Sequence, residues 1–535
     1  MTLEPNAFTA ATRTGANLVV TAGPGSGKTE MLAQRADFLL RTGQSRYPHR
    51  LLAISFKADA AKNLTNRVRR RCSPQQAARL DSYTFHAFAK RLIDTFRPVL
   101  TGVDALDRDY EVGPSYLPPH QIDFQNMAPL ATTILEQSAV ARAALRHTYG
   151  FVFLDEFQDC TSNQYALLRA AFHGTGVQLI AVGDIKQRIM GWAGALEGVL
   201  ARFADDFAAE RLSLYLNHRS QPRLRRVQNA MVRQMEPADA LDDGAIEGTG
   251  GVVEVLRYPD SATEARDLAD RIQGWIVRDG VPAEEIAVLV ANQVRPYTEA
   301  LRAELRARRV PFRDETELQD LASEPVATLI LDYLAVITED GQPDAYARLV
   351  DVATGWHEDE EITRRAYSAI GQFLDKERAA YRAGSSGGLD ASADRFLAQV
   401  GGDVLAGLGP QYQQGNRLQQ VVDEVWQRLR EILNQTNDVG LTLQEFAGSY
   451  AVKLMTVHKA KGLEFRSVVV LGVEHEMYFG GATAARSTYF VAVSRARQNL
   501  YLTTAARRPL PSAPVRRWDE ERNPHSEFLG YASTS

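Results

Sequence analysis

The sequence is poor in cysteine, in lysine and in long apolar segments. Its 535 residues include two cysteines, Cys72 and Cys160, which are too few for a disulfide framework or a cysteine-based zinc site. No apolar run approaches the roughly 20 residues that a membrane-spanning helix needs, so we expect no membrane partner. The first residues lack a basic segment followed by an apolar core, which argues against a signal peptide and predicts a cytoplasmic protein.

The composition is otherwise that of an ordinary globular protein, with 45% apolar and 24% charged residues. The formal net charge is −5, so a nucleic acid would have to bind in a local basic groove and not through the charge of the whole surface. The length predicts about three or four domains.

The most informative segment is a glycine-rich stretch after the apolar residues Leu18–Val20. It comprises Ala22, Gly23, Pro24, Gly25, Ser26, Gly27, Lys28 and Thr29. A strand that leads through such a loop into a helix directs several backbone N–H groups at one point, where a phosphate chain can bind. Lys28 would reach the terminal phosphates, and the Thr29 hydroxyl would bind Mg²⁺. The segment therefore predicts a nucleotide-binding protein, although Ala22 occupies a position that the strict pattern gives to glycine.

A second apolar segment, Phe151–Leu154, ends in the acidic pair Asp155 and Glu156. A nucleotide hydrolase needs one carboxylate at such a strand end to hold Mg²⁺, and a second one to orient and deprotonate the attacking water. Asp155 fits the first role and Glu156 fits the second. An acidic pair alone is often only a helix cap, but it becomes informative together with the phosphate loop.

Three further polar residues follow strands or helices at a distance from the loop. Gln187 follows the expected strand 177–182 and is placed to bond a γ-phosphate or the attacking water, although a polar turn is the alternative. Arg219 and Arg495 are candidates for arginines that arrive from another domain and neutralise the transition state. Each of them alone would be interpreted as a surface residue.

The order of apolar and amphipathic segments predicts an α/β fold with parallel sheets. Strands are expected at 17–22, 50–55, 81–85, 151–155 and 177–182, and then at 252–257, 286–291, 452–457, 467–472 and 499–504. Helices of the second series are expected at 261–278, 296–307 and 487–497. We expect a first domain formed by 1–96 and 150–215 with an insertion at 97–149, and a second formed by 216–345 and 450–510 with a helical insertion at 346–449. Residues 511–535, rich in Pro and Arg, are expected to be a loosely attached tail.

The motifs, taken in order, resemble those of superfamily 1 helicases of the UvrD/Rep/PcrA type. The matching segments are Ala22–Thr29, Ile54–Ala61, Thr84–His86, Asp155–Asp159, Gly183–Ala195, Asn217–Ser220, Thr456–Phe465 and Val491–Arg497. The resemblance implies two RecA-like P-loop NTPase domains, each with a short, mostly helical insertion. ATP and Mg²⁺ would bind between the domains, and DNA would cross their shared top face.

The resemblance also implies a role for individual residues. Those expected to bind and hydrolyse ATP are Lys28, Thr29, Asp155, Glu156, Gln187, Arg219 and Arg495, with Gly462 and Glu464 near the ribose and the phosphates. Those expected to face single-stranded or partly duplex DNA are Ser55, Phe56, Thr84, His86, Trp192 and His458. Bases would stack on Phe56 and Trp192, for which core packing is the alternative.

The sequence departs from the family at several positions. Ala7, beside Asn6, stands near the place of the glutamine that reads adenine, and His218 stands where a tyrosine is usual. Met190 and Ala193 replace a tyrosine and an arginine of the Gly183–Ala195 segment, and Phe56 is followed by 57–59 (Lys-Ala-Asp) in place of Thr-Asn-Lys. These departures predict an intact ATPase with an altered DNA track.

Two functions remain open at this point. The first is an ATP-dependent DNA translocase or helicase, for which the resemblance implies 3′-to-5′ movement. The second is a DNA-sensing, nucleotide-switched regulatory subunit with little unwinding activity. The insertions, of about 50 and 100 residues, are short for the group. In this the chain resembles the helicase-like subunit of the Gabija anti-phage system, which implies a nuclease partner in defence.

Overall fold

The computed structural model describes residues 4–56, 58–191, 194–354, 360–409, 412, 416–448, 450–478, 481–515 and 517–534. The chain divides into two compact units. Unit 1 comprises Met1–Leu100, Gln125–Thr316 and Val452–Ser535, and unit 2 comprises Thr101–Phe124 and Glu317–Ala451. Of the predicted insertion 97–149, residues Thr101–Phe124 therefore belong to unit 2 and the rest to unit 1.

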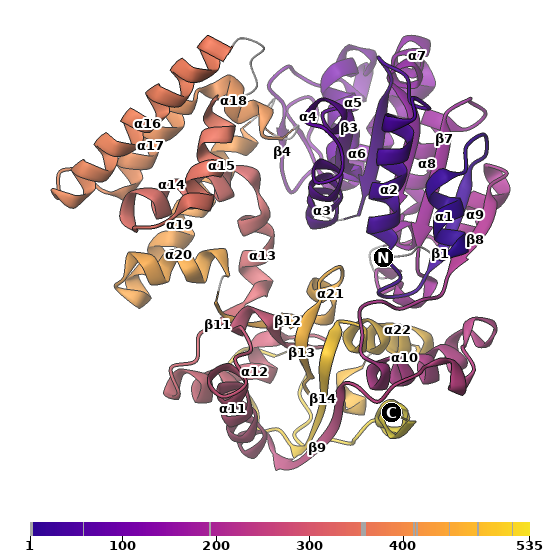
Figure 1. Ribbon diagram of the computed structural model, residues 1–535, viewed down its shortest axis with the longest axis vertical. Helices are drawn as coiled ribbons and strands as arrows, with labels where there is room; N and C mark the ends of the chain where they lie inside the picture. Colours follow the sequence, from indigo (N-terminus) through magenta and orange to yellow (C-terminus); the bar gives the residue numbers. More distant parts are fainter. Residues whose placement is uncertain are drawn as a thin grey trace. The chain divides into compact units, whose positions relative to one another are not determined.

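The first sheet of unit 1 has six parallel strands in the order β3-β2-β6-β7-β1-β8 (Figure 1). Its strands are β1 Leu18–Ala22, β2 Arg50–Ser55, β3 Leu80–Thr84, β6 Tyr149–Asp155, β7 Gln178–Gly183 and β8 Glu210–Leu214. The central strands are rich in Leu, Ile and Val and are buried on both faces, as expected for a parallel sheet covered by helices.

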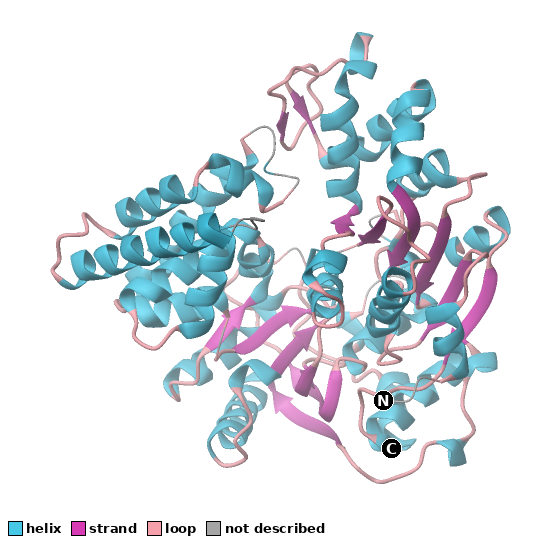
Figure 2. Cartoon of the chain, turned by 45° about the horizontal axis from the view of Figure 1, so that its top comes forward, coloured by secondary structure: helices cyan, strands magenta, loops and turns pink. Residues whose placement is uncertain are grey.

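Helices cover both faces of this sheet (Figure 2). They are α1 Pro5–Thr12, α2 Lys28–Arg41, α3 Ala58–Arg69, α4 Pro74–Ala77, α5 Phe85–Phe96, α6 Phe124–Gln137, α7 Ala139–Thr148, α8 Ser162–Phe172 and α9 Val199–Asp206. The connections β1–β2 and β2–β3 cross the sheet in one direction, and β3–β6, β6–β7 and β7–β8 cross it in the other. Because such crossovers are right-handed, α2 and α3 lie on one face and α5–α9 on the other.

The second sheet of unit 1 is also parallel and has the order β11-β12-β10-β13-β14-β9. Its strands are β9 Val252–Asp260, β10 Ile286–Val290, β11 Phe312–Asp314, β12 Val452–Thr456, β13 Phe465–Val470 and β14 Ala496–Arg507. Its helices are α10 Pro222–Met235, α11 Ser261–Val277, α12 Val294–Ala307, α21 Val457–Ala460, α22 Ala482–Val493 and α23 Ser526–Gly530. The predicted α/β class with two parallel sheets is thus confirmed.

Two expectations for the second half were wrong. The helix expected at 487–497 is α22, which ends at Val493, and β14 begins at Ala496. The expected loose tail is packed, because Phe528 and Leu529 are buried in the core under the second sheet and the Phe528 ring stacks on Tyr489 with the ring centroids 4.5 Å apart. The fraction of Pro and Arg in this segment gave no sign of these apolar anchors.

Unit 2 is mostly helical. Its helices are α13 Glu315–Ser323, which begins in unit 1, then α14 Pro325–Thr338, α15 Pro343–Thr354, α16 Glu360–Arg382, α17 Leu389–Val400, α18 Gly402–Gly407, α19 Arg417–Thr436 and α20 Val439–Ala447. A short strand pair, β4 Glu111–Val112 and β5 Gln121–Ile122, completes it. The core is built around α14, which is buried on most sides and stacks Tyr333 on Phe396 at 4.3 Å between centroids.

Short 3₁₀ turns connect these elements, and two of them carry residues of interest: η3 Phe157–Asp159 and η4 Ile185–Gln187. The others are η1 Arg97–Val99, η2 Gly102–Asp104, η6 Pro237–Asp239, η7 Asp243–Ala245, η8 Ala283–Glu285, η10 His475–Met477 and η11 Tyr531–Thr534. Among the described residues, no helix combines the length and the apolar character that crossing a bilayer requires.

Candidate functional site

The phosphate loop leaves the carboxyl end of β1 and closes at the first turn of α2. Gly25 and Gly27 have φ values of 70° and 81°, in the left-handed region that favours glycine. A Cβ on Gly25 would also collide with Asn217 and Arg219, which pack against the loop. The Lys28 Nζ donates to the carbonyl oxygens of Ala22 at 3.2 Å and Gly23 at 3.4 Å, so the ammonium group is held over the loop.

The two predicted carboxylates lie at the end of β6, beside this loop. Burial, and secondly the charge of Glu156, raise the pKa of Asp155 to about 7. Burial also raises the pKa of Glu156, but the charges of Lys28 and Lys461 outweigh that effect and lower it to about 2. Glu156 is therefore ionised at neutral pH and can accept a hydrogen bond from an attacking water.

The residues present fit a magnesium ion. The Thr29 Oγ1 lies 3.5 Å from the Asp155 Oδ2, so two oxygen ligands converge beside the phosphate loop. Mg²⁺ is bound by one or two protein oxygens while the substrate phosphates and waters supply the rest. Within the described residues there is no group of three His, Cys, Asp or Glu that would form an all-protein metal site. A bound ion would supply positive charge to the β- and γ-phosphate oxygens.

The part of unit 1 that is built on the second sheet, which we call its second half, contributes cations beside the phosphate loop. The Arg495 side chain is 2% exposed, and its Nη2 donates to the Gln187 Oε1 at 2.8 Å. Its Nε and Nη1 donate to the carbonyl oxygens of Val491 and Leu463, which fix the guanidinium plane. Burial and then Arg219 lower the pKa of Arg495 to about 9, which leaves it charged at neutral pH.

Arg219 and Glu464 form an ion pair at the edge of the site. The Arg219 Nε donates to the Glu464 Oε2 at 2.6 Å, and its Nη1 donates to the Ser494 carbonyl oxygen at 3.2 Å. The backbone of this loop is tied to the phosphate loop, because the His218 N–H donates to the Gly25 carbonyl oxygen at 2.9 Å. A nucleotide that entered here would therefore contact both halves of unit 1.

Sequence reasoning gave no role to Lys461, although it lies inside the Thr456–Phe465 segment. Its Nζ pairs with the Asp159 carboxylate and donates to the Gln187 carbonyl oxygen at 2.7 Å. Both Lys461 and Asp159 are buried. The signal available in the sequence was that the chain has only nine lysines and that Lys461 is one of those inside a motif segment. Because a buried lysine must be paired, a lysine at such a place indicates a partner.

These residues line one cavity of about 930 Å³. Of the predicted nucleotide-site residues it brings together Pro24, Gly25, Ser26, Gly27, Lys28, Thr29, Asp155, Glu156, Gln187, Arg219, Gly462, Glu464 and Arg495. Ala22 and Gly23 lie in the loop but do not line it. The volume is within the range of small-molecule and cofactor sites.

The residues predicted to face DNA are not gathered in the same way. Phe56 lines the nucleotide cavity, which the sequence did not indicate. Ser55 is fully buried and its hydroxyl finds no hydrogen-bond partner among the residues that the structure describes, and Thr84 caps α5 by accepting from the Ala87 N–H at 3.1 Å. Burial lowers the pKa of His86. His458 lies partly buried in α21, while Trp192 and Ala193 lie outside the described residues.

A phosphate loop at the carboxyl edge of one parallel sheet, with an arginine arriving from a second parallel sheet, defines a P-loop nucleotide-binding protein of two RecA-like halves. Residues 6–193 match a protein-family model described as AAA domain, and residues 411–507 match one described as UvrD-like helicase C-terminal domain.

Relatives extend this match over most of the chain. DNA helicase II of Escherichia coli (strain K12) is 25% identical over 615 residues, covering 92% of this chain and 83% of the relative. DNA helicase II of Salmonella typhimurium (strain LT2) is also 25% identical, with the same shares. ATP-dependent DNA helicase PcrA of Staphylococcus aureus is 22% identical over 640 residues, covering 96% of this chain and 83% of the relative. The chain belongs to the UvrD/Rep/PcrA-like group of superfamily 1 helicases.

Proposed function

We propose that this chain is an ATP-dependent motor that hydrolyses ATP on single-stranded DNA and moves along the strand. One observation carries the proposal: Arg495 and Lys461 from the second half of unit 1 contact Gln187 and Asp159 beside the phosphate loop. Binding of a triphosphate between these groups would draw the halves together, and hydrolysis would release them. The relatives are named as DNA helicases, which supports DNA as the track.

In this proposal the residues divide the chemistry as follows. Lys28 holds the β- and γ-phosphates, Thr29 and Asp155 hold Mg²⁺, and Glu156 orients the attacking water. Gln187, Arg219 and Arg495 stabilise the charge that develops on the γ-phosphate. Gly462 and Glu464 lie near the ribose and the phosphates.

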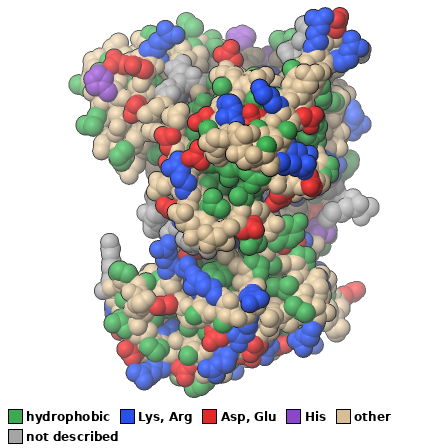
Figure 3. Space-filling view, turned by 90° about the vertical axis from the view of Figure 1, so that its left-hand side faces the viewer, with side chains coloured by type: hydrophobic (Ala, Val, Ile, Leu, Met, Phe, Trp, Pro, Cys, Tyr) green, Lys and Arg blue, Asp and Glu red, His purple; other side chains and the backbone are tan. Residues whose placement is uncertain are grey.

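The DNA contacts are proposed at the carboxyl ends of β2, β3 and β12, together with Trp192 of the Gly183–Ala195 segment. Phe56 and Trp192 would stack on bases, and Ser55, Thr84, His86 and His458 would lie along the strand. Ser55 would require a local opening of its buried site, because its hydroxyl does not reach the surface. Figure 3 shows acidic and basic side chains interspersed on one face of the molecule, in keeping with the net charge of −5. Binding would thus depend on local contacts rather than on a general positive field.

The alternative is a nucleotide-switched regulatory ATPase with little unwinding activity. It is favoured by Met190, which stands where the family has a tyrosine in the Gly183–Ala195 segment. Movement in the 3′-to-5′ direction, a cytoplasmic location and a role in anti-phage defence beside a nuclease stay predictions, the last of which rests on the short insertions.

Two assays on the same preparation test the proposal. We expect single-stranded DNA to stimulate ATP hydrolysis strongly. We expect Lys28→Ala to lower ATP turnover by about 10²- to 10³-fold while the circular dichroism spectrum stays unchanged. A strand-displacement assay then separates the candidates, because a motor displaces a labelled strand and a switch does not. Turnover that persists in Lys28→Ala would refute the assigned site, and stimulation without displacement would support the regulatory subunit.

A further inference from the structure

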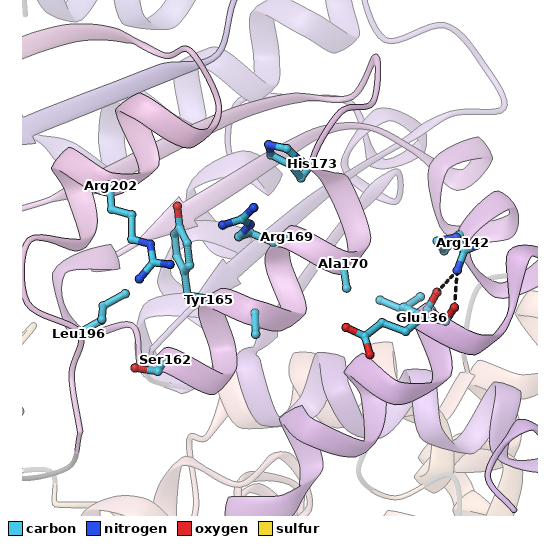
Figure 4. A pocket seen from close by; sticks show the side chains of 11 residues that line it. Glu136, Arg142, Ser162, Tyr165, Arg169, Ala170, His173, Leu196 and Arg202 are labelled. Carbon is cyan, nitrogen blue, oxygen red and sulfur yellow. Dashed lines mark hydrogen bonds between the residues drawn. The ribbon is translucent and has the colours of Figure 1, made fainter.

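A second concave site lies on the opposite face of the first sheet from α2. It is a groove of about 650 Å³ along α8, which we name the α8 groove. Its floor is formed by Ser162, Ala166 and Ala170, which share one face of the helix because they are four residues apart. Leu196 and Arg202 stand on one side of α8, and Glu136 and Arg142 stand on the other (Figure 4). The small side chains of the floor let another chain approach the helix closely.

The sides of the groove are rich in arginine. Arg169 and Arg202 flank the Tyr165 ring (Figure 4), with the Arg202 guanidinium 5.1 Å from the ring centroid. The nearby Asp206 accepts from the Tyr165 hydroxyl at 2.8 Å and from Arg169 Nη1 at 3.2 Å, and it lies 3.7 Å from Arg202 Nε. The two arginines, Arg169 and Arg202, thus share the negative charge of one carboxylate. Their side chains are 40% and 52% exposed, so both guanidinium groups still reach solvent in the groove.

Arg142 adds a third cation on the other side. Its Nη1 donates to the carbonyl oxygens of Leu135 and Glu136 at the end of α6, the second at 2.9 Å, which fixes its position. Three arginines therefore face two carboxylates, those of Glu136 and Asp206, and the groove has an excess of positive charge. Ala170 lies between Arg169 and Arg142 (Figure 4), and Leu135, Ala166 and Leu196 add apolar atoms to the lining.

The chemistry favours a peptide over a small phosphate. Phosphate sites commonly use the free backbone N–H groups at a helix N-terminus. At the start of α8 a capping box takes up two N–H groups, because the Gln164 N–H donates to the Thr161 Oγ1 at 3.3 Å and the Thr161 N–H donates to the Gln164 Oε1 at 3.0 Å. The positive charge is instead carried by separated side chains with apolar atoms between them. A DNA backbone would place its row of phosphates against Glu136 and Asp206, which disfavours nucleic acid.

We propose that the α8 groove binds an acidic, partly apolar peptide segment of a partner protein. The carboxylates of the peptide would pair with Arg169, Arg202 and Arg142, and its apolar side chains would lie on Ala166 and Ala170. The groove adjoins the nucleotide site, because the Leu196 N–H donates to the Cys160 carbonyl oxygen at 2.8 Å, one residue beyond Asp159.

Fluorescence anisotropy with a fluorescein-labelled peptide, Asp-Glu-Leu-Asp-Glu-Leu-Asp-Glu, tests this proposal on the full chain. We expect the wild type to bind at millimolar concentration or below. Arg202→Glu, which reverses a charge, and Ala166→Gln, which fills the floor without changing charge, should each weaken binding by about tenfold or more. None of these residues belongs to the proposed catalytic site, so unchanged ATP turnover reports an intact fold.

Two matched controls sharpen the result. Arg211→Glu makes the same charge reversal at an exposed residue outside the groove, where Arg211 pairs with Asp205 at 3.0 Å, and Ala166→Ser keeps the floor small. Both should bind the peptide like the wild type. Equal weakening by Arg211→Glu, no effect of Ala166→Gln, or absence of binding at millimolar peptide would overturn the proposal. So would a short DNA duplex that binds more tightly than the peptide and loses affinity in the same variants, since the groove would then be a nucleic-acid surface.

Discussion

The nucleotide cavity has two walls that differ in how their charges are held. The wall from the first sheet carries Lys28 and Thr29 in the first turn of α2 and Asp155 at the end of β6, and these groups contact one another or their own loop. The wall from the second sheet contributes Arg495 and Lys461, whose polar groups reach across to the first wall. The first wall can thus bind phosphates by itself, whereas the second delivers its charge only when the two halves of unit 1 are together.

Gln187 is the residue at which the walls meet. Its side-chain oxygen accepts from Arg495, its backbone oxygen accepts from Lys461, and its Nε2 donates to the buried Asp184 at 2.8 Å. A shift of either half would change the contacts with Arg495 and Lys461, while the bond to Asp184, which lies in the same turn, would keep Gln187 in place. Hydrolysis should therefore depend more steeply on the second wall than nucleotide binding does.

The sharpest test of this difference is Arg495→Ala. We expect ATP turnover to fall by about 10³-fold or more, because in the proposed function the arginine neutralises charge in the transition state, whereas ATP affinity should change little. Single-turnover kinetics together with binding of a fluorescent ATP analogue would separate the two effects.

Arg497→Ala is the matched control, since Arg497 lies two residues away and pairs with Glu285 outside the cavity. Its Nη1 also lies 3.9 Å from Glu464, but Glu464 keeps its closer partner Arg219, at 2.6 Å, in this variant. Its turnover should stay within a few-fold of the wild type. If Arg495→Ala lost affinity as much as turnover, the two walls would not differ in the way described.

On the first wall, Glu156→Gln should lower turnover by about 10²-fold and leave ATP bound. The substitution removes the charge that orients the water but keeps the size of the side chain and its ability to accept from the Gln158 Nε2, which lies 2.6 Å from the Glu156 Oε2. Persistent hydrolysis in this variant would mean that another group activates the water.

The first wall could be predicted almost completely from the sequence, and the second only in part. The phosphate loop and the Asp155–Glu156 pair are contiguous segments next to strands, so their geometry follows from local structure. The pairing of Lys461 with Asp159 joins residues 302 positions apart, and no local pattern encodes it. The same holds for residues 511–535, where Glu527 accepts from the Arg486 Nε at 2.6 Å. Composition alone indicated a loose tail, because it cannot show where the partners of a charged residue lie.

A third test concerns the ion pair between Lys461 and Asp159, which joins the two walls. Lys461→Met leaves the Asp159 carboxylate buried without its cation, which should cost about 3–5 kcal/mol of folding free energy and reduce turnover by about tenfold. Chemical denaturation and steady-state ATPase assays measure the two effects.

The double variant Lys461→Met/Asp159→Asn removes both charges and should recover most of the stability but not the turnover. If turnover recovered as well, the pair would serve only to stabilise the fold, and the second wall would act through Arg495 alone.

The smallest expected effect is that of Thr29→Ala on the first wall. Loss of one oxygen ligand should raise the Mg²⁺ concentration for half-maximal hydrolysis by about threefold to tenfold, while excess Mg²⁺ restores most of the maximal rate, because Asp155 and the phosphates still bind the ion. Titration of Mg²⁺ at saturating ATP measures this shift. Thr29→Ser keeps the hydroxyl and should titrate like the wild type. A loss of rate that excess Mg²⁺ does not restore would instead mean that Thr29 positions the first turn of α2, and that the first wall depends on packing and not on metal ligation.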